Sequence, residues 1–256
     1  MITHVDCLGA PDCELDLALA AELQGALLPP QRALSCPHQH AAALNRMCGS
    51  VGGDFLDLIQ LNEEQIAVVM GDVVGHGVMA SLLMAIIMGH VRSNPADCAK
   101  PVEMVTSLNA MLLDLGDRSG AVVPCSIFYA VVDVPSGVGF FVNAGHPMPF
   151  LCDRRTSSSI QLGEGNILIG VEDFVPRESC HTFLPGERLV LYTDGVIDAT
   201  NTEGQRFNRS RLHDVLNANA PADAPACARA VFEAVDAFRN GVRQTDDESI
   251  LVIDRN

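Results

Sequence analysis

The sequence lacks a long apolar run. The most apolar stretch, Val78 to Met88, is interrupted by Ser81 and followed by His90 and Arg92, so no segment is long enough to span a bilayer. The N-terminal residues, MITHVDCLGAPDCELD, also lack the basic start and apolar core of a secretory signal. We therefore expect a cytoplasmic protein that makes no membrane contact.

Closely spaced cysteines are absent as well. The nine cysteines are odd in number, scattered along the chain and never spaced as Cys-x-x-Cys. This pattern argues against a disulfide framework and against a cysteine-bound zinc site. Two loop motifs are also missing: a glycine-rich phosphate loop ending in Lys-Ser or Lys-Thr, and the Gly-x-Ser-x-Gly of many serine hydrolases. A P-loop nucleotide site and serine-nucleophile chemistry are therefore poorly supported.

Basic residues are scarce. The chain has 16 lysines and arginines against 32 aspartates and glutamates, which gives a formal net charge of −16. A field of this sign repels nucleic acid and anionic lipid, so neither is an expected partner. Ordinary acidic solubility explains such a charge, but so do clustered carboxylates that bind a cation. The charge alone leaves both interpretations open.

An amphipathic helix is predicted near the N-terminus, from Cys13 to Leu28. Leucines recur at four-residue steps, and Pro29-Pro30 ends the pattern. Such a stripe packs into a core in many proteins, but at a terminus it also serves as a dimer contact or a coupling element. Both interpretations stay open. The leucines of the stripe are Leu15, Leu19, Leu23 and Leu27.

The rest of the chain alternates apolar strands with turns and a few helices. This order is typical of an α+β domain in which antiparallel sheets pack against helices. With 48% hydrophobic residues in 256, we expect one such domain over residues 31–256, preceded by the leading helix in residues 1–30. The helix at Val78 to Arg92 is apolar around its circumference, so we expect it to be buried on most sides. The predicted strands are Gln65–Gly71, Ser126–Val134, Val138–Asn143, Arg188–Thr193 and Ile250–Ile253, and the other predicted helices are Pro101–Leu115, Arg209–Asn217 and Ala224–Phe238.

Four aspartates share one local setting, at the mouth of an apolar strand or turn: Asp54, Asp72, Asp194 and Asp246. Neighbouring strands lie about 5 Å apart, so carboxylates at their ends can converge on one or two cations. Two Mg²⁺ or Mn²⁺ ions in such a place can activate a water and neutralise a phosphoryl group. Each aspartate alone is an ordinary turn or cap residue, but the four together favour a metal site.

Several motifs in their order along the chain resemble the PPM (type-2C) metal-dependent Ser/Thr protein phosphatases, in the bacterial SpoIIE-like and RsbU-like branch. The resemblance runs from about Leu23 to Ile253, nearly the whole chain. The segments that carry it are Leu27 to Pro30 (LLPP), Val51 to Asp57 (VGGDFLD), Gly71 to Gly77 (GDVVGHG), Asn143 to Pro149 (NAGHPMP), Leu191 to Val196 (LYTDGV) and Asp246 to Ile253 (DDESILVI).

The resemblance implies an α-β-β-α sandwich of two antiparallel sheets flanked by helix pairs, with two Mn²⁺ or Mg²⁺ ions at one edge. It also implies that Asp72 bridges both ions, with Asp194 and Asp246 on one and Asp54 and the carbonyl of Val73 on the other. Asp72 and Asp194 are then the catalytic residues, and a metal-activated water attacks the phosphorus. The implied activity is hydrolysis of phosphoserine or phosphothreonine in a protein.

Other motif residues are expected to shape the substrate loops: Gly75, His76, Gly77, Asn143 and His146. His76 and His146 are also candidate acids for the leaving alkoxide, although a packed, hydrogen-bonded histidine is the commoner case.

The last motif departs from the family pattern Asp-Asp-(apolar)-Thr. Ser249 supplies a hydroxyl in place of the threonine, and Glu248 is expected to add a charge near the site. Asp246 is preferred to Asp247 as the ligand.

Relatives of this branch typically act on phosphorylated anti-sigma-factor antagonists, which are small STAS-domain proteins. The resemblance thus implies a role in sigma factor regulation. A homodimer through the leading helix is a further possibility. Two other functions remain as alternatives: a catalytically silent docking module with a phosphatase fold, and another metal-dependent phosphoesterase.

Overall fold

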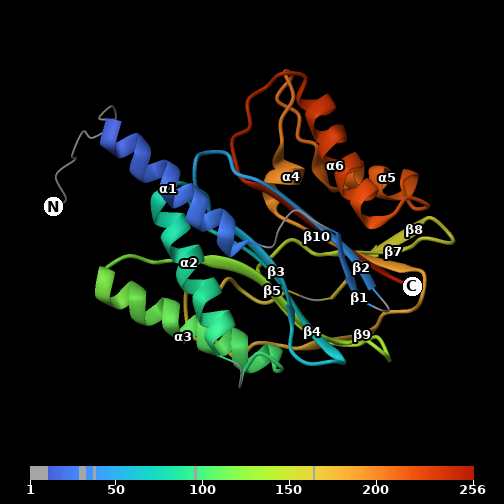
Figure 1. Ribbon diagram of the computed structural model, residues 1–256, viewed down its shortest axis with the longest axis horizontal. Helices are drawn as coiled ribbons and strands as arrows, with labels where there is room; N and C mark the ends of the chain where they lie inside the picture. The colour runs from blue at the N-terminus through green and yellow to red at the C-terminus, as the bar shows by residue number, and fades with distance from the viewer. Residues whose placement is uncertain (1–10, 29–32, 37–38, 95–96, 164) are drawn as a thin grey trace.

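Two antiparallel β-sheets pack face to face in the computed structural model of the chain, with helices outside them (Figure 1). The structure describes residues 11–28, 33–36, 39–94, 97–163 and 165–256. One sheet has the strand order β1-β2-β11-β10-β7-β8, and the other has the order β3-β4-β5-β6-β9. The strands are β1 (Ala33–Cys36), β2 (Gln39–Arg46), β3 (Asp54–Gln60), β4 (Gln65–Val73), β5 (Cys125–Asp133), β6 (Val138–Ala144), β7 (Phe150–Asp153), β8 (Ser158–Gln161), β9 (Ser179–Thr182), β10 (Glu187–Tyr192) and β11 (Glu248–Arg255).

Helices cover the outer face of each sheet. α2 and α3 pack on the five-stranded sheet, and α5 and α6 pack on the six-stranded sheet. The α+β class and the α-β-β-α sandwich predicted from the sequence are therefore confirmed. No helix in the described ranges is long and apolar enough to cross a membrane. The helices are α1 (Pro11–Leu27), α2 (Val78–Ser93), α3 (Pro101–Ser119), α4 (Asp194–Asp198), α5 (Asn208–Ala218) and α6 (Ala224–Arg239).

The central strands are apolar on both faces, because each contributes to two cores. In β4, Val68 and Met70 face the other sheet, whereas Val69 and Val73 face α2 and α3. This alternation follows from the two-residue period of a strand. It explains why β4 appears in the sequence as a continuous apolar run that ends abruptly at an acidic residue, Asp72.

α2 is less buried than the sequence predicts. One face packs into the core, but the opposite face is exposed along its length, so the prediction that α2 is buried on most sides is wrong. The exposed face is nevertheless apolar. Its residues are Val78, Met79, Leu82 and Ile86, whose exposed fractions are 55%, 72%, 60% and 44%.

α1 forms the predicted leading helix and packs beside α2 (Figure 1). Three leucines of its stripe, Leu15, Leu19 and Leu23, nevertheless point to solvent, with exposed fractions of 61%, 50% and 71%. Core packing is therefore the wrong interpretation for these three residues. The face of α1 that meets the domain instead carries Gln24, which is buried.

Candidate functional site

Asp54 and Asp72 face each other on adjacent strands of the five-stranded sheet. Asp54 is the first residue of β3 and is the direct cross-strand partner of Asp72 near the end of β4. Asp54 is almost fully buried. Burial raises the pKa of Asp54 well above its usual value, and repulsion from Asp72 raises it further. Such a pair is stabilised by a shared proton or by a bound cation.

The other predicted aspartates lie close enough to repel this pair. Burial, followed by repulsion from Asp194, Asp246 and Asp247, raises the pKa of Asp72 to about 8. Partial loss of solvent is the first cause of the raised pKa values of Asp194 and Asp246, although both side chains keep exposed surface, and repulsion from Asp246 raises the pKa of Asp194 further. The structure therefore brings together the four aspartates that the sequence analysis singled out.

Two hydroxyl groups hold Asp54 in place. Thr193 Oγ1 and Ser249 Oγ both donate hydrogen bonds to Asp54 Oδ2, at 2.8 and 2.6 Å. Asn45 Nδ2 in turn donates to Ser249 Oγ at 2.7 Å. Thr193 follows β10 and Ser249 lies in β11, so these bonds tie Asp54 of one sheet to the other sheet. Both residues lie inside sequence motifs, LYTDGV and DDESILVI, but the motifs do not show that their hydroxyls bind Asp54.

The turn before Asp54 is built from glycines because the backbone of β4 approaches it closely. A Cβ on Gly53 would lie 2.8 Å from the carbonyl oxygen of Val73, and one on Gly52 would collide with the carboxylate of Asp247. Val73 N also donates to Gly53 O at 3.4 Å. The carbonyl of Val73 thus lies beside the turn that leads into Asp54.

Asp246 and Asp247 have different surroundings. Asp247 is buried, and its two carboxylate oxygens accept backbone N–H groups from Cys48 and Gly53 at 2.7 and 2.8 Å. Asp246 is exposed, and its Oδ1 accepts a bond from its neighbour's backbone N–H at 2.9 Å. Asp247 therefore anchors the loop before Asp54, whereas Asp246 keeps an oxygen available to a ligand.

Asp194 begins α4, directly after β10 and Thr193. Gly195 makes this position possible, because a Cβ there would collide with the carbonyl oxygen of Asp247. Asp-Gly is a common turn sequence, but here the glycine is needed because α4 lies close to the segment that enters β11.

A hollow of about 550 Å³ opens beside these carboxylates. Its wall includes Asp72 and Asp194, together with His146, Arg206 and Arg209. The hollow is large enough for a phosphorylated side chain, and it is lined by both acidic and basic groups.

The donor set fits a hard divalent cation. Within the described ranges, no three His, Cys, Asp or Glu side chains converge into a complete metal-binding cluster. The carboxylates and the Val73 carbonyl are nonetheless all oxygen donors, which Mg²⁺ and Mn²⁺ prefer. The carboxylates repel one another, which destabilises the metal-free site, and a bound cation would remove this repulsion. The residues therefore suit a divalent cation.

The two motif histidines differ. His146 is buried, its Nδ1 lies 3.0 Å from Ser126 Oγ, and burial lowers its pKa to about 3, so it is a neutral packed histidine. His76 is exposed between Gly75 and Gly77, so the expectation of a packed histidine is wrong there. Both glycines have positive φ angles, 109° and 77°, which turn the chain sharply after β4.

Asn143 shapes the loop that carries His146. Its side-chain Oδ1 accepts the backbone N–H of His146 at 2.9 Å, and its backbone carbonyl accepts that of Asn166 at 2.7 Å. Gly145 completes the turn with φ 72°. These contacts fix the shape of the loop, and a role of Asn143 in substrate binding stays a prediction.

Glu248 does not add a charge to the site, contrary to the expectation from the sequence. It is buried and forms ion pairs with Arg46, at 2.7 Å, and with Arg239. Consecutive residues of a strand point to opposite faces, so Ser249 faces Asp54 while Glu248 faces α6.

α1 contacts the turn before Asp54 through Gln24, a residue that carries no sequence motif. Gln24 Nε2 donates to Gly52 O at 2.7 Å, and Gly52 N donates to Gln24 Oε1 at 3.1 Å. Both bonds are buried and end two residues before Asp54. A polar residue beside a leucine stripe gives no sequence signal for such a contact.

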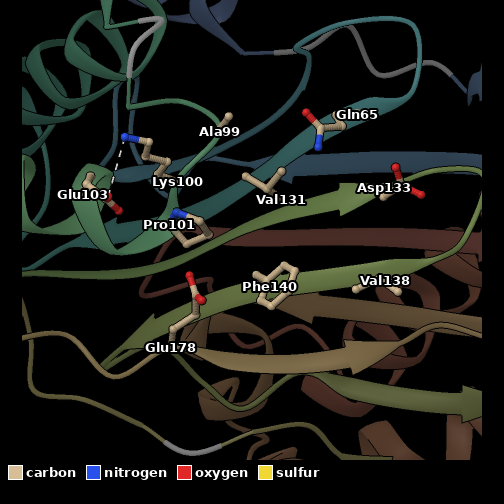
Figure 2. Close-up of a pocket in the computed structure, with 10 residues that line it drawn as sticks. All are labelled: Gln65, Ala99, Lys100, Pro101, Glu103, Val131, Asp133, Val138, Phe140 and Glu178. Carbon is tan, nitrogen blue, oxygen red and sulfur yellow. Dashed lines mark ion pairs between the residues drawn. The ribbon is translucent and has the colours of Figure 1, made fainter.

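A second hollow, of about 400 Å³, lies at the other end of the same strands (Figure 2). Val131, Val138 and Phe140 form its apolar floor, and the ion pair between Lys100 and Glu103, at 3.8 Å, lies on its rim. None of the predicted site residues lines it, so it is separate from the carboxylate site.

Comparisons with known proteins find a matching family model and several relatives. The family model described as stage II sporulation protein E (SpoIIE) matches residues 62–256. The phosphoserine phosphatase RsbU of Bacillus subtilis is 22% identical over 94% of this chain and 70% of its own length. The chain spans less than half the length of two other curated relatives, at 42% and 49%.

Solved structures share the fold. The SiaA-PP2C domain of Pseudomonas aeruginosa superposes with a TM-score of 0.84 at 22% identity, covering 96% of this chain and 98% of that domain. The structure of RsbX in complex with magnesium has a TM-score of 0.66 at 11% identity, covering 88% of this chain and 99% of that protein.

Proposed function

Because the chain belongs to the SpoIIE family of PPM-type phosphatases, we propose that it is a metal-dependent protein serine/threonine phosphatase. The observation that carries the proposal is the group of mutually repelling carboxylates around Asp54 and Asp72 at the edge of a hollow. RsbU, a phosphoserine phosphatase by name, and RsbX, solved with magnesium, support the activity and the metal.

The proposed ligands are Asp54, Asp72, Asp194, Asp246 and the carbonyl of Val73. When bound, two Mn²⁺ or Mg²⁺ ions supply a water of lowered pKa and neutralise the phosphoryl charge. The chain fixes the orientation of Asp54 through the hydroxyls of Thr193 and Ser249. Since burial raises the pKa of Asp72 to about 8, metal binding near neutral pH is expected to release its proton.

The substrate that we propose is a phosphorylated STAS-domain anti-sigma-factor antagonist, in a pathway that regulates a sigma factor. The name of RsbU supports phosphoserine in particular. The exposed leucines of α1 support a homodimer through the leading helix, with residues 31–256 as the phosphatase domain. Sedimentation of the wild type and of a Leu19→Ser variant tests the dimer, and identical sedimentation would rule it out.

The alternatives are less well supported. A silent docking module would not need all four carboxylates, and all four are present together. Some other phosphoesterases use an adjacent His-Asp pair at their site. The sequence has one such pair, His213-Asp214, on α5. His213 lies against Phe150, with ring centroids 5.9 Å apart, and not among the site carboxylates.

Metal dependence tests the proposed function directly. We expect hydrolysis of p-nitrophenyl phosphate with Mn²⁺ or Mg²⁺, and none above background with a chelator, because the carboxylates alone cannot activate water. Steady-state rates over a metal titration measure this. Equal rates with metal and with chelator would contradict the proposal, and no turnover by folded protein under any condition would favour the docking module.

Gln24 is expected to support the site through Gly52. Gln24→Ala leaves the buried N–H and carbonyl of Gly52 without partners, which costs about 1–3 kcal/mol of stability and loosens the turn before Asp54. We expect the Mn²⁺ concentration for half-maximal p-nitrophenyl phosphate hydrolysis to rise about 10-fold.

Glu22→Gln, an exposed change on the same helix, is the matched control and leaves the Mn²⁺ requirement unaltered. If Gln24→Ala and Glu22→Gln have the same Mn²⁺ requirement, the contact of α1 with Gly52 has no part in metal binding.

A further inference from the structure

Two arginines line the same hollow as Asp72 and Asp194. Arg206 lies in the loop between α4 and α5, and Arg209 lies at the second position of α5. Both side chains are exposed, and both border the hollow that also contains Asp72 and Asp194. They place positive charge in the same hollow as two of the proposed metal ligands, in a protein of formal net charge −16.

Neither arginine has a role that explains its position in the fold. Arg206 pairs with Asp198 at 2.9 Å, but that pair is exposed and such pairs contribute little to stability. Within the described part of the chain, Arg209 forms no ion pair, and its guanidinium lies near the hydroxyl of Tyr192. By contrast, Arg92 and Arg188 are each held by a carboxylate at 2.6 Å.

The chemistry of guanidinium suits an anion that enters the hollow. Its planar array of donors binds phosphate or carboxylate through two parallel hydrogen bonds, and a guanidinium has more donors than one contact uses. Arg206 binds Asp198 through Nη1, so its other nitrogens are still donors toward an anion. The aspartates would hold the metal ions that neutralise the phosphoryl group, and the two arginines are then available to the substrate's other anionic groups or to a remaining phosphoryl oxygen.

We propose that Arg206 and Arg209 form an anion-binding subsite that holds the phosphorylated segment of the protein substrate. This inference rests on the proposed phosphatase function and adds to it a requirement for negative charge on the substrate. The anion is either the phosphoryl group itself or an acidic residue next to the phosphoserine. The subsite therefore contributes to substrate binding and not to the chemical step.

The test compares the wild type with the double variant Arg206→Ala/Arg209→Ala on three substrates with Mn²⁺. The substrates are p-nitrophenyl phosphate, a phosphoserine peptide flanked by aspartates, and the same peptide flanked by alanines. We expect KM for the aspartate-flanked peptide to rise about 10-fold or more in the variant, with kcat nearly unchanged. Arg209→Lys keeps the charge but not the planar donor array, so its KM for the aspartate-flanked peptide should lie between those of the wild type and the double variant.

The pattern across substrates identifies the anion. A rise in KM confined to the aspartate-flanked peptide assigns the subsite to flanking carboxylates, and an equal rise for all three substrates assigns it to the phosphoryl group. Arg229→Ala, which removes an exposed arginine of α6 outside the hollow, should leave every KM unchanged. Unchanged KM values in the double variant, or a loss of kcat alone, would overturn the proposal.

A second measurement distinguishes failure of the proposed phosphatase activity from failure of the proposed subsite. If the wild type hydrolyses none of the substrates, peptide binding measured by fluorescence anisotropy still tests the subsite. Weaker binding of the aspartate-flanked peptide by the double variant would then support it, and equal binding would refute it.

Discussion

Replacing Asp72 with asparagine is expected to lower kcat for p-nitrophenyl phosphate hydrolysis by at least about 1,000-fold, a loss of about 4 kcal/mol in transition-state stabilisation. Asp72 is the cross-strand partner of Asp54 and is repelled by Asp194 and Asp246, so it is the carboxylate that links the others. Asparagine has nearly the same volume but cannot supply the negative charge that a second cation requires. Steady-state kinetics over a Mn²⁺ titration measure the effect.

The same substitution is expected to stabilise the metal-free protein. Folding holds Asp72 at a pKa of about 8, above its value in the unfolded chain. The native state thus binds the extra proton, and stability falls as pH rises from about 4 toward 8. The asparagine side chain of the variant does not titrate, so the melting temperature of the variant at pH 8 should exceed that of the metal-free wild type. A residue needed only for the fold would show the opposite sign.

Asp214→Asn is the matched control for the loss of activity. Asp214 lies on α5, has a largely exposed side chain and does not line the hollow. The control should keep wild-type kcat and Mn²⁺ requirement. If Asp72→Asn retains more than a tenth of the wild-type kcat, Asp72 is not a required metal ligand.

Arg188→Met is expected to reduce the free energy of unfolding by about 3–5 kcal/mol. Arg188 is fully buried, and its Nε and Nη2 donate to the two carboxylate oxygens of Asp254 at 2.6 and 2.9 Å. It also donates to the backbone carbonyls of Asn219 and Ala222, at 3.1 and 2.6 Å. Methionine fills much of the space but leaves the Asp254 carboxylate and both carbonyls without these donors. Urea denaturation followed by circular dichroism measures the change.

An exposed ion pair serves as the control for the buried pair of Arg188 and Asp254. Arg118 pairs with Asp114 on α3 at 2.7 Å, and both side chains are more than half exposed. Arg118→Met should change stability by less than about 0.5 kcal/mol. Adding Asp254→Leu to Arg188→Met should recover much of the loss, since it removes a buried carboxylate that would keep only Arg154, at 3.4 Å, as an ion-pair partner. Equal effects of the two single arginine variants would refute the account of the buried pair.

The sequence is informative about this fold where strands are buried on both faces. β4, β5, β10 and β11 all lie where apolar runs predict them, because each contributes side chains to two cores. The sequence does not show which helix faces are covered. α2 is apolar around its circumference, but only one side meets the sheet, and α1 meets the domain through Gln24 and not through its exposed leucines.

The site was predictable to the same degree. Short motifs placed each aspartate at a strand end, and the topology then brought the strand ends together. What a motif cannot show is the direction of a side chain within it. Ser249 and Glu248 are neighbours, yet one holds Asp54 and the other pairs with two arginines on the opposite face. His76 and His146 both follow glycine-containing turns, but only His146 is buried.

The most direct test of the central claim, that these carboxylates hold divalent metal, is Mn²⁺ binding measured by isothermal titration calorimetry at pH 7.5. The account predicts that the wild type binds two Mn²⁺ ions with release of protons, that Asp72→Asn loses most of this binding, and that Asp214→Asn keeps it. Identical Mn²⁺ binding by the wild type and by Asp72→Asn would contradict the account.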